Sequence, residues 1–271
     1  YGDHRDLHKE YRRQRQMCIR DRLMAELVLV GCFGACIGSF CSMLIYRLPE
    51  IRNDKSITLS SPRSFCPDCR SSLSIWMLIP IFSYLMQKGY CSNCNQRISS
   101  SYLLNELVHT LIILLIALNI GINFIGFIHY LIFSIFYILF FLDLKHLYLP
   151  IYLNMSLICI GLLVNTTFNL FASFQGSLLG LIAGFGSLWF INAVYKIIKS
   201  KDGIGGGDFI LLGGLGSIFG ISSLGPIVLL GSSCSILIYA LSNKLEREEI
   251  PLGSGLILGG IFFYLIKTIF I

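Results

Sequence analysis

Eight stretches of this chain are long and apolar enough to cross a lipid bilayer. They lie at residues 23–46, 103–122, 124–142, 149–171, 174–195, 208–222, 224–242 and 252–270. A helix needs roughly 17 to 25 such residues to cross hydrocarbon. Charged residues make up only 13% of the chain and hydrophobic residues 55%, whereas about 25% charged residues is usual in a soluble domain. The sequence therefore predicts an all-α polytopic membrane protein with about eight transmembrane helices.

Basic residues set the predicted orientation of these spans. The long loop 47–101 contains seven Lys and Arg residues, whereas the short connections 119–123, 165–175 and 219–225 contain none. Because Lys and Arg are enriched in cytoplasmic loops, we predict that loop 47–101 is cytoplasmic. The predicted topology then places Asp143 and Asp208 at the same cytoplasmic membrane surface.

The first 22 residues disagree with this orientation. They also contain seven basic residues, yet they would lie on the side of the membrane opposite loop 47–101. Their run QMCIRDR resembles translated adapter sequence, in which case Met24 is the natural start. We interpret residues 1–22 as a non-native segment or a disordered basic tail and exclude them from the fold prediction.

Loop 47–101 contains two C-x-x-C motifs, Cys66 to Cys69 and Cys91 to Cys94, separated by 21 residues. Four thiolates in this pattern can surround one tetrahedral zinc ion. A loop of 55 residues buries little apolar surface, so a metal would supply most of its folding free energy. Two disulfides or a redox-active pair are the alternatives, and a cytoplasmic location disfavours disulfides.

Polar residues also mark the spans on either side of this loop. Arg47 and Pro49 follow the first span, where we expect the proline to stop the helix and the arginine to act as an anchor rather than a catalytic group. Glu106 lies about one turn into the second span, on the same helical face as His109. An intramembrane Glu either orients a catalytic group or partner helix, or makes a structural polar contact.

Two aspartates at the ends of different spans are the candidate catalytic residues. Asp143 ends the third span, and Asp208 follows the glycine cluster 203–207 at the start of the sixth. These glycines do not match a phosphate-binding loop, because no G-K-[ST] follows them. Of two adjacent carboxylates, one keeps a proton to polarise a peptide carbonyl while the other activates the attacking water. The pair predicts an aspartic protease.

The order of these motifs resembles that of the type IV prepilin peptidases over residues 23–271. The resemblance rests on the paired cysteine motifs, IYRLP at 45–49, the run from Trp76 to Leu85, LDLKHLYLP at 142–150 and GIGGGD at 203–208. It implies an eight-span aspartic endopeptidase of the bacterial inner membrane. Such enzymes remove the leader of type IV prepilins or type II secretion pseudopilins at the cytoplasmic face, and many then methylate the new N-terminus with S-adenosylmethionine.

Residue by residue, the resemblance implies specific roles. It assigns catalysis to Asp143 and Asp208, matches Gly205 and Gly207 to the glycines of G-x-G-D, and assigns structural zinc to the four loop cysteines. We further interpret Glu106 as support for this machinery. The sequence contains no recognisable nucleotide-binding motif, so the methyltransferase activity is implied by the resemblance alone.

Three positions depart from the family pattern. Ile151 stands where the family usually has Asp, Ile210 where it has Lys, and IPLGSGL at 250–256 replaces I-P-F-G-P-F-L. Because of these departures, a catalytically impaired homologue that acts as an assembly scaffold remains an alternative function. A membrane transporter would also place acids near a broken helix, although the sequence shows no internal repeat. A thiol oxidoreductase built on the C-x-x-C pairs is a further alternative.

The predicted organisation has four parts. Residues 1–22 are the excluded tail, 23–46 the first span, 47–101 the cytoplasmic zinc-binding insert with its four cysteines, and 102–271 a seven-span catalytic membrane domain. We expect prepilin or pseudopilin substrates and the lipid bilayer as partners, and no nucleic acid.

Overall fold

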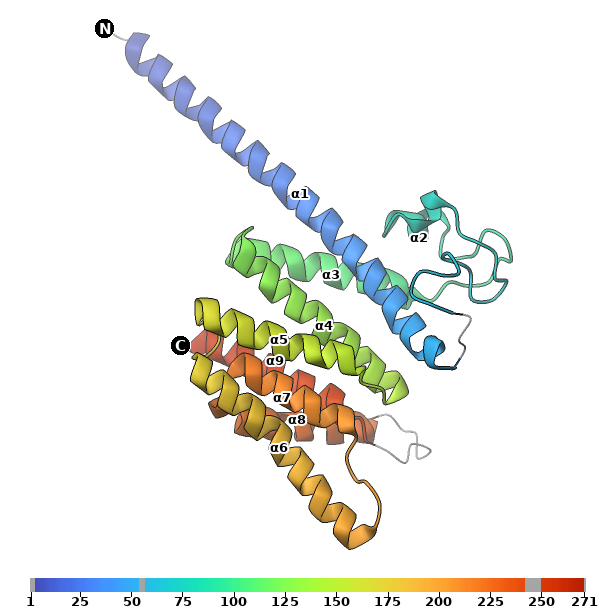
Figure 1. Ribbon diagram of the computed structural model, residues 1–271. Coiled ribbons are helices and arrows are strands. Elements are labelled where there is room, and N and C mark those ends of the chain that lie inside the picture. Colours follow the sequence, from blue (N-terminus) through green and yellow to red (C-terminus); the bar gives the residue numbers. More distant parts are fainter. Residues whose placement is uncertain (1–2, 54–56, 242–249, 271) are drawn as a thin grey trace. The chain divides into compact units, whose positions relative to one another are not determined.

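Every described element of the computed structural model is helical (Figure 1), as the sequence predicts. The structure describes residues 3–53, 57–241 and 250–270. The chain divides into two compact units, Tyr1–Ser134 and Ile135–Ile271, with the boundary inside one long helix. Each unit is described by itself below.

Six described helices are long and apolar enough to cross a membrane. They are Arg20–Asn53 of α1 (Asp3–Asn53), α3 (Ser100–Asn119), α4 (Phe124–His146), α5 (Ile151–Phe168), α6 (Phe174–Lys199) and Ile221–Leu241, which includes α8 (Leu224–Leu241). Two further apolar helices are shorter: α7 (Gly206–Phe219) and the part Leu252–Lys267 of α9 (Leu252–Phe270). The chain is therefore a multi-pass, all-α membrane protein, and the count of eight spans stays a prediction.

Helix α1 differs from its predicted form at both ends. Residues 3–22 continue the helix without a break, whereas a disordered tail was one of the two expectations for them; that they are non-native stays a prediction. At the other end, Pro49 lies inside the helix, which continues to Asn53. The expectation that Pro49 stops the helix is wrong. A proline removes one backbone hydrogen bond and crowds the preceding turn. The two residues before it, Arg47 and Leu48, are buried, and we attribute the continuation of the helix to this packing.

In the first unit α1 packs along α3. Gly38 makes this close approach possible, because a Cβ there would lie 2.7 Å from the backbone oxygen of Asn105. The Asn105 side-chain amide donates to the Ser42 hydroxyl at 2.8 Å. Interhelical contacts through small residues and polar side chains are typical of membrane helices. The packed helices α1 and α3 hold the two ends of the insert that connects them.

The insert between α1 and α3 contains a 3₁₀ turn, η1 (Ile75–Leu78), and a short helix, α2 (Phe82–Met86). Arg47 ties its first part to α1: the guanidinium donates to the carbonyl oxygens of Thr58 at 2.7 Å and Pro62 at 2.6 Å. Arg47 is buried, so it holds the backbone of the insert against the end of α1 instead of anchoring the span at the membrane surface.

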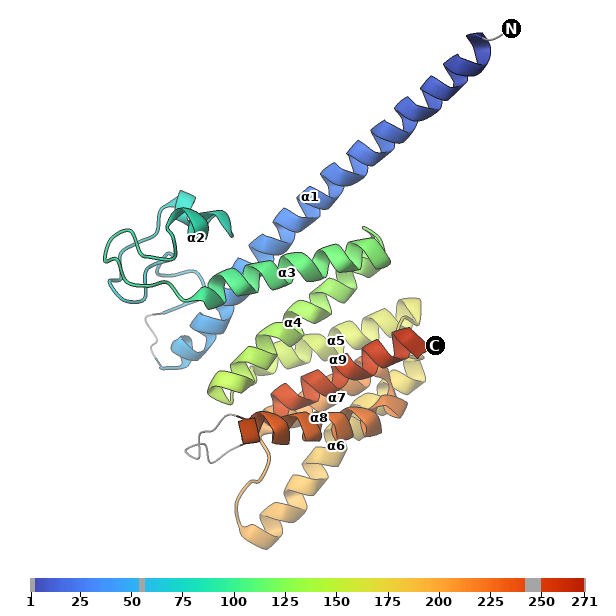
Figure 2. The same ribbon diagram turned by 180° about the vertical axis from the view of Figure 1, so that it is seen from behind.

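In the second unit α7 is the central helix (Figure 2), packed against α5, α6 and α9. Its side chains Leu211, Leu212 and Leu215 are fully buried. Gly180 of α6 and Gly216 of α7 face each other so closely that a Cβ on either would overlap the backbone of the other. An apolar helix enclosed on all sides is a rigid support, and the GIGGGD motif leads directly into its N-terminus.

Candidate active site

Asp143 lies in the last turn of α4 and is buried. Its Oδ2 accepts a hydrogen bond from the backbone N–H of Ser254 at 2.5 Å. Ser254 is in the first turn of α9, where backbone N–H groups have no partner within the helix. The carboxylate therefore occupies a favourable position for negative charge at a helix N-terminus.

Asp208 lies in the first turn of α7. Its own backbone N–H donates to the Gly205 carbonyl at 3.1 Å, whereas its side-chain Oδ1 is buried and has no hydrogen-bond partner among the described residues. Leu149 lies beside both Gly207, which precedes Asp208, and Gly253, which borders the Asp143 carboxylate. The structure thus places the two predicted acids around the same residues within one unit, and it leaves one oxygen of the pair available.

Glycines make room for both carboxylates. A Cβ at Gly253 would lie 3.0 Å from Asp143 Cγ, and a Cβ at Gly205 would lie 3.1 Å from Asp208 Oδ2. A Cβ at Gly207 would lie 2.8 Å from Leu149 Cβ. These distances are at or inside the limit of normal packing, so a larger residue at any of the three would displace a neighbour at the acid pair.

Asn154 completes the polar surroundings of the site. It is fully buried in α5, and its amide donates to the Gly207 carbonyl at 3.2 Å. Its Oδ1 is buried without a hydrogen-bond partner among the described residues. Buried polar atoms are normally satisfied, so the Oδ1 atoms of Asn154 and Asp208 mark places for a water molecule or a substrate group.

Asn192 holds the loop that precedes the glycine motif. Its Oδ1 accepts from the N–H groups of Gly203 at 2.8 Å and Ile204 at 3.0 Å. Its amide donates to Asp202 at 3.0 Å, and Lys196 donates to the other oxygen of Asp202 at 3.0 Å. Asp202 is exposed and is part of this hydrogen-bonded group.

The four predicted metal ligands also come together. The sulfur atoms of Cys66, Cys69, Cys91 and Cys94 all lie within 4.8 Å of one another, and the described cysteines are free thiols. Both motifs make the same turn, with Cys66 N–H donating to Ser71 O at 3.0 Å and Cys91 N–H to Gln96 O at 2.9 Å. Zinc–sulfur bonds of about 2.3 Å in a tetrahedron place the sulfurs about 3.8 Å apart, so the cluster needs only a small contraction to hold one zinc ion.

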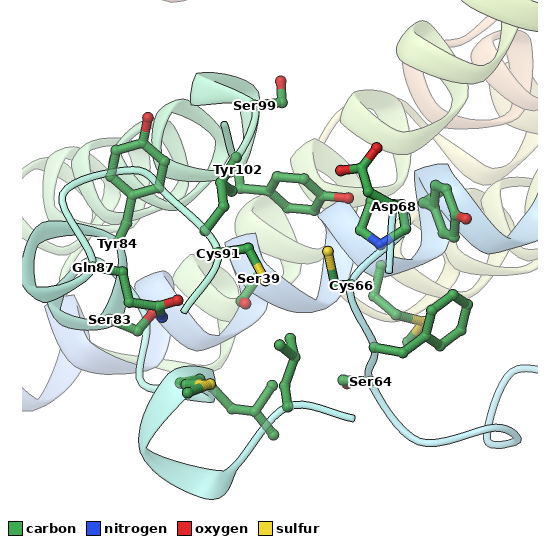
Figure 3. A pocket seen from close by; sticks show the side chains of 18 of the residues that line it. Ser39, Ser64, Cys66, Asp68, Ser83, Tyr84, Gln87, Cys91, Ser99 and Tyr102 are labelled. Carbon is green, nitrogen blue, oxygen red and sulfur yellow. The ribbon is translucent and has the colours of Figure 1, made fainter. Parts of the chain in front are cut away.

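A cavity of about 420 Å³ lies in the first unit between the insert, α1 and α3 (Figure 3). Its wall includes Cys66 and Cys91, so the metal cluster forms one side of it. Glu106 contributes a buried carboxylate, and Tyr46, Tyr84 and Tyr102 contribute aromatic rings. The cavity has the size and the mixed polar and aromatic lining typical of small-molecule sites.

Glu106 makes its contact inside the first unit, with the insert. Its Oε2 accepts from the backbone N–H of Ile81 at 2.6 Å, which ties the tip of the insert to α3. At the departures from the family pattern, Ile151 opens α5 with its side chain 63% exposed, and Ile210 follows Asp208 in α7.

Comparison with known proteins decides the family. Residues 32–120 match the bacterial peptidase A24 N-terminal domain, and residues 130–241 match the type IV leader peptidase family. A prepilin leader peptidase/N-methyltransferase of Neisseria gonorrhoeae is 34% identical over 81% of this chain and 82% of its own length. The chain belongs to the type IV leader peptidase family.

Other members of this family agree. A prepilin leader peptidase/N-methyltransferase of Dichelobacter nodosus is 32% identical over 90% of this chain and 93% of its own length. A type 4 prepilin-like proteins leader peptide-processing enzyme of Escherichia coli is 30% identical over 91% of this chain and 96% of its own length. No solved structure is significantly similar to the chain. Membership in this peptidase family favours the protease over the transporter, scaffold and oxidoreductase alternatives.

Several site residues are absent from the sequence-based assignment. Gly253 and Ser254 approach Asp143 from more than a hundred positions away, and Asn154 and Asn192 support the glycine motif from α5 and α6. The segment IPLGSGL at 250–256 was a usable signal for the first two, because it stands in the place of a family motif and keeps the Ile, Pro, Gly and final Leu of that motif.

Proposed function

We propose that this protein is an aspartic endopeptidase that cleaves the leader peptide of type IV prepilins or type II secretion pseudopilins. The observation that carries the proposal is that Asp143 and Asp208, from two helices, lie around the same residues, Leu149, Gly207 and Gly253, with one carboxylate oxygen unpaired among the described residues. Family membership and the printed names of the relatives supply the reaction and the substrate class. Cleavage takes place at the cytoplasmic face of the inner membrane.

In the proposed mechanism the two carboxylates share one proton, because two adjacent negative charges repel each other. The Asp143 carboxylate accepts a hydrogen bond from the Ser254 N–H, whereas Asp208 Oδ1 has no hydrogen-bond partner among the described residues. Because a hydrogen bond to a carboxylate favours its charged form, we assign the water-activating carboxylate to Asp143. Asp208 then holds the proton and donates it to the oxygen of the scissile carbonyl. Water loses a proton to Asp143 as its oxygen attacks the carbonyl carbon, which gives a tetrahedral diol. Asp143 then passes that proton to the peptide nitrogen, the C–N bond breaks, and Asp208 regains its proton from the diol as the new carboxyl group forms.

The test is cleavage of a type IV prepilin by membranes that contain this chain or one of two variants, Asp143→Asn and Asp208→Asn. Both variants keep side-chain size but lose the ability to carry negative charge. We expect both to insert at wild-type levels and to lose cleavage by at least about 100-fold, the usual scale for a lost general acid or base. Full activity in either variant would refute the mechanism.

We also propose that the Cys66, Cys69, Cys91 and Cys94 cluster holds one structural zinc ion. The close grouping of the four sulfurs and the repeated turn around each motif support this assignment. Four thiolates leave no coordination position open for substrate. The metal would therefore stabilise the insert and the adjacent cavity wall.

The relatives' names include N-methyltransferase, and we propose that the 420 Å³ cavity binds S-adenosylmethionine. This cofactor supplies a methyl group on a positively charged sulfur. The carboxylate of Glu106 suits the cationic groups, and the rings of Tyr46, Tyr84 and Tyr102 can contact the adenine or the sulfonium.

Photocrosslinking of radiolabelled S-adenosylmethionine tests this assignment without relying on activity. Tyr102→Ala should lower the crosslinked label, while Tyr90→Ala, a tyrosine on the same insert that does not line the cavity, should leave it unchanged. Prepilin cleavage should persist in both variants. Equal labelling in all three proteins would place the cofactor elsewhere.

A further inference from the structure

The insert carries an apolar segment that the proposed catalytic functions do not explain. Residues 75–86, called here the 75–86 segment, comprise η1, a short link and α2. Ile75, Trp76 and Met86 are 72%, 77% and 68% exposed, and Leu78, Phe82 and Leu85 are also exposed. The segment contains no charged residue. Apolar surface gathered in this way marks an interaction site.

The backbone of the 75–86 segment is suited to an apolar environment, where an unpaired N–H is costly. Turn hydrogen bonds satisfy Met77, Ser83 and Leu85, with N–H to carbonyl distances of 3.0, 3.0 and 3.1 Å. Ile81 stands at the joint between η1 and α2 with φ at 63°, an unusual value for a β-branched residue. The backbone N–H of Ile81 donates the hydrogen bond to Glu106 Oε2 at 2.6 Å.

The segment lies beside two helices, α1 and α3, that are long and apolar enough to cross a membrane. Glu106 is six residues beyond the start of α3 at Ser100, which is about 9 Å along the helix axis. The link residues Ile79, Pro80 and Ile81 also line a cavity of about 580 Å³ whose other walls are residues of α1 and α3, including Val28 and Leu118. Figure 1 shows the insert beside these two helices. The segment therefore runs alongside parts of α1 and α3 that cross the bilayer.

We propose that the 75–86 segment inserts into the cytoplasmic leaflet of the bilayer as a re-entrant element. Its exposed apolar side chains contact lipid acyl chains, and Trp76 lies near the headgroup boundary that tryptophan favours. Arg70 and Lys88 flank the segment and reach the headgroups. The expected cytoplasmic insert is then a mixed element: its metal cluster faces water while its 75–86 segment lies in lipid.

Tryptophan fluorescence tests this proposal directly, because the chain contains two tryptophans, Trp76 and Trp189. The Trp189→Phe variant reports Trp76 alone. In vesicles of phosphatidylcholine and phosphatidylglycerol, we expect blue-shifted emission, strong quenching by lipids brominated near the top of the acyl chain, weaker quenching by lipids brominated near its end, and little quenching by aqueous iodide.

A matched control places the reporter elsewhere on the insert. Tyr90→Trp in a Trp76→Phe, Trp189→Phe background puts tryptophan at an exposed position between the two cysteine motifs, and iodide should quench it several-fold more than it quenches Trp76. Water-like emission of Trp76 with full iodide quenching would overturn the proposal. Iodide quenching that disappears only when a prepilin is added would also overturn it, since the segment would then bind substrate. Neither outcome bears on cleavage, which is measured separately with the aspartate variants.

Discussion

Replacing Asn192 with alanine tests whether the loop before the glycine motif must be held for cleavage. The change removes two bonds accepted from the N–H groups of Gly203 and Ile204 and one donated to Asp202. Each of these three hydrogen bonds contributes about 0.5–1.5 kcal/mol. Because the loop is partly exposed, water replaces some of the lost bonds, and we take the total loss as about 2 kcal/mol. If the ordered loop is needed to place Asp208, kcat/KM falls roughly 30-fold.

The assay is cleavage of purified prepilin by equal amounts of inserted enzyme. Asn192→Asp keeps the acceptor for the two N–H groups but sets a second carboxylate against Asp202, so it should lie between alanine and wild type. Asn119→Ala removes an exposed asparagine that donates one bond within α3, and it should have no effect. An Asn192→Ala enzyme within twofold of wild type would refute the reasoning.

The same hydrogen-bonded group has a pH dependence. Hydrogen bonds from Lys196 and Asn192 hold the pKa of Asp202 below its usual value. A carboxyl group with a lowered pKa stabilises the folded arrangement at neutral pH, and this contribution is lost as the pH falls through the lowered pKa. Proteolytic nicking at residues 200–205 should therefore stay slow near neutrality and increase in acid, whereas Asp202→Asn should remove that dependence.

Three further changes test other parts of the structure. Gly253→Ala places a Cβ 3.0 Å from Asp143 Cγ and should lower cleavage at least about 10-fold; Gly186→Ala, where a Cβ meets nothing within 4 Å, should not. Cys69→Ser should abolish stoichiometric zinc, measured by atomic absorption, and a variant that keeps full zinc would contradict the four-cysteine site. Asn165→Ala removes hydrogen bonds to α6, α7 and the backbone of Phe171 and Ala172; at about 1 kcal/mol or more each, the unfolding temperature should drop by several degrees.

The sequence predicts the helices well because membrane spans depend on run length and apolarity, both of which are local. Each of the eight predicted segments corresponds to a helix. The failure at Pro49 has a tertiary cause: burial of Arg47 and Leu48 continues the helix past a residue that usually ends one.

The candidate site was predictable in part for the same reason. Acids and glycines at span ends stand out against an apolar background, and so do paired cysteines. Ser254 and Asn192 do not, because a serine near a helix start and an asparagine near a helix end are ordinary in any sequence. Their roles come from contacts between helices, which residue spacing alone does not specify.

In the proposed mechanism, the shortness of α7 sets the depth at which Asp208 acts. Its 14 residues extend about 21 Å, whereas the hydrocarbon layer is about 30 Å thick; α6 beside it has 26 residues and extends about 39 Å. If the far end of α7 reaches the opposite boundary, Asp208 sits below the lipid surface, and water must enter a notch to reach it. The cleavage rate then depends on the thickness of the host membrane, because each methylene added to the lipid acyl chains increases the depth of this notch.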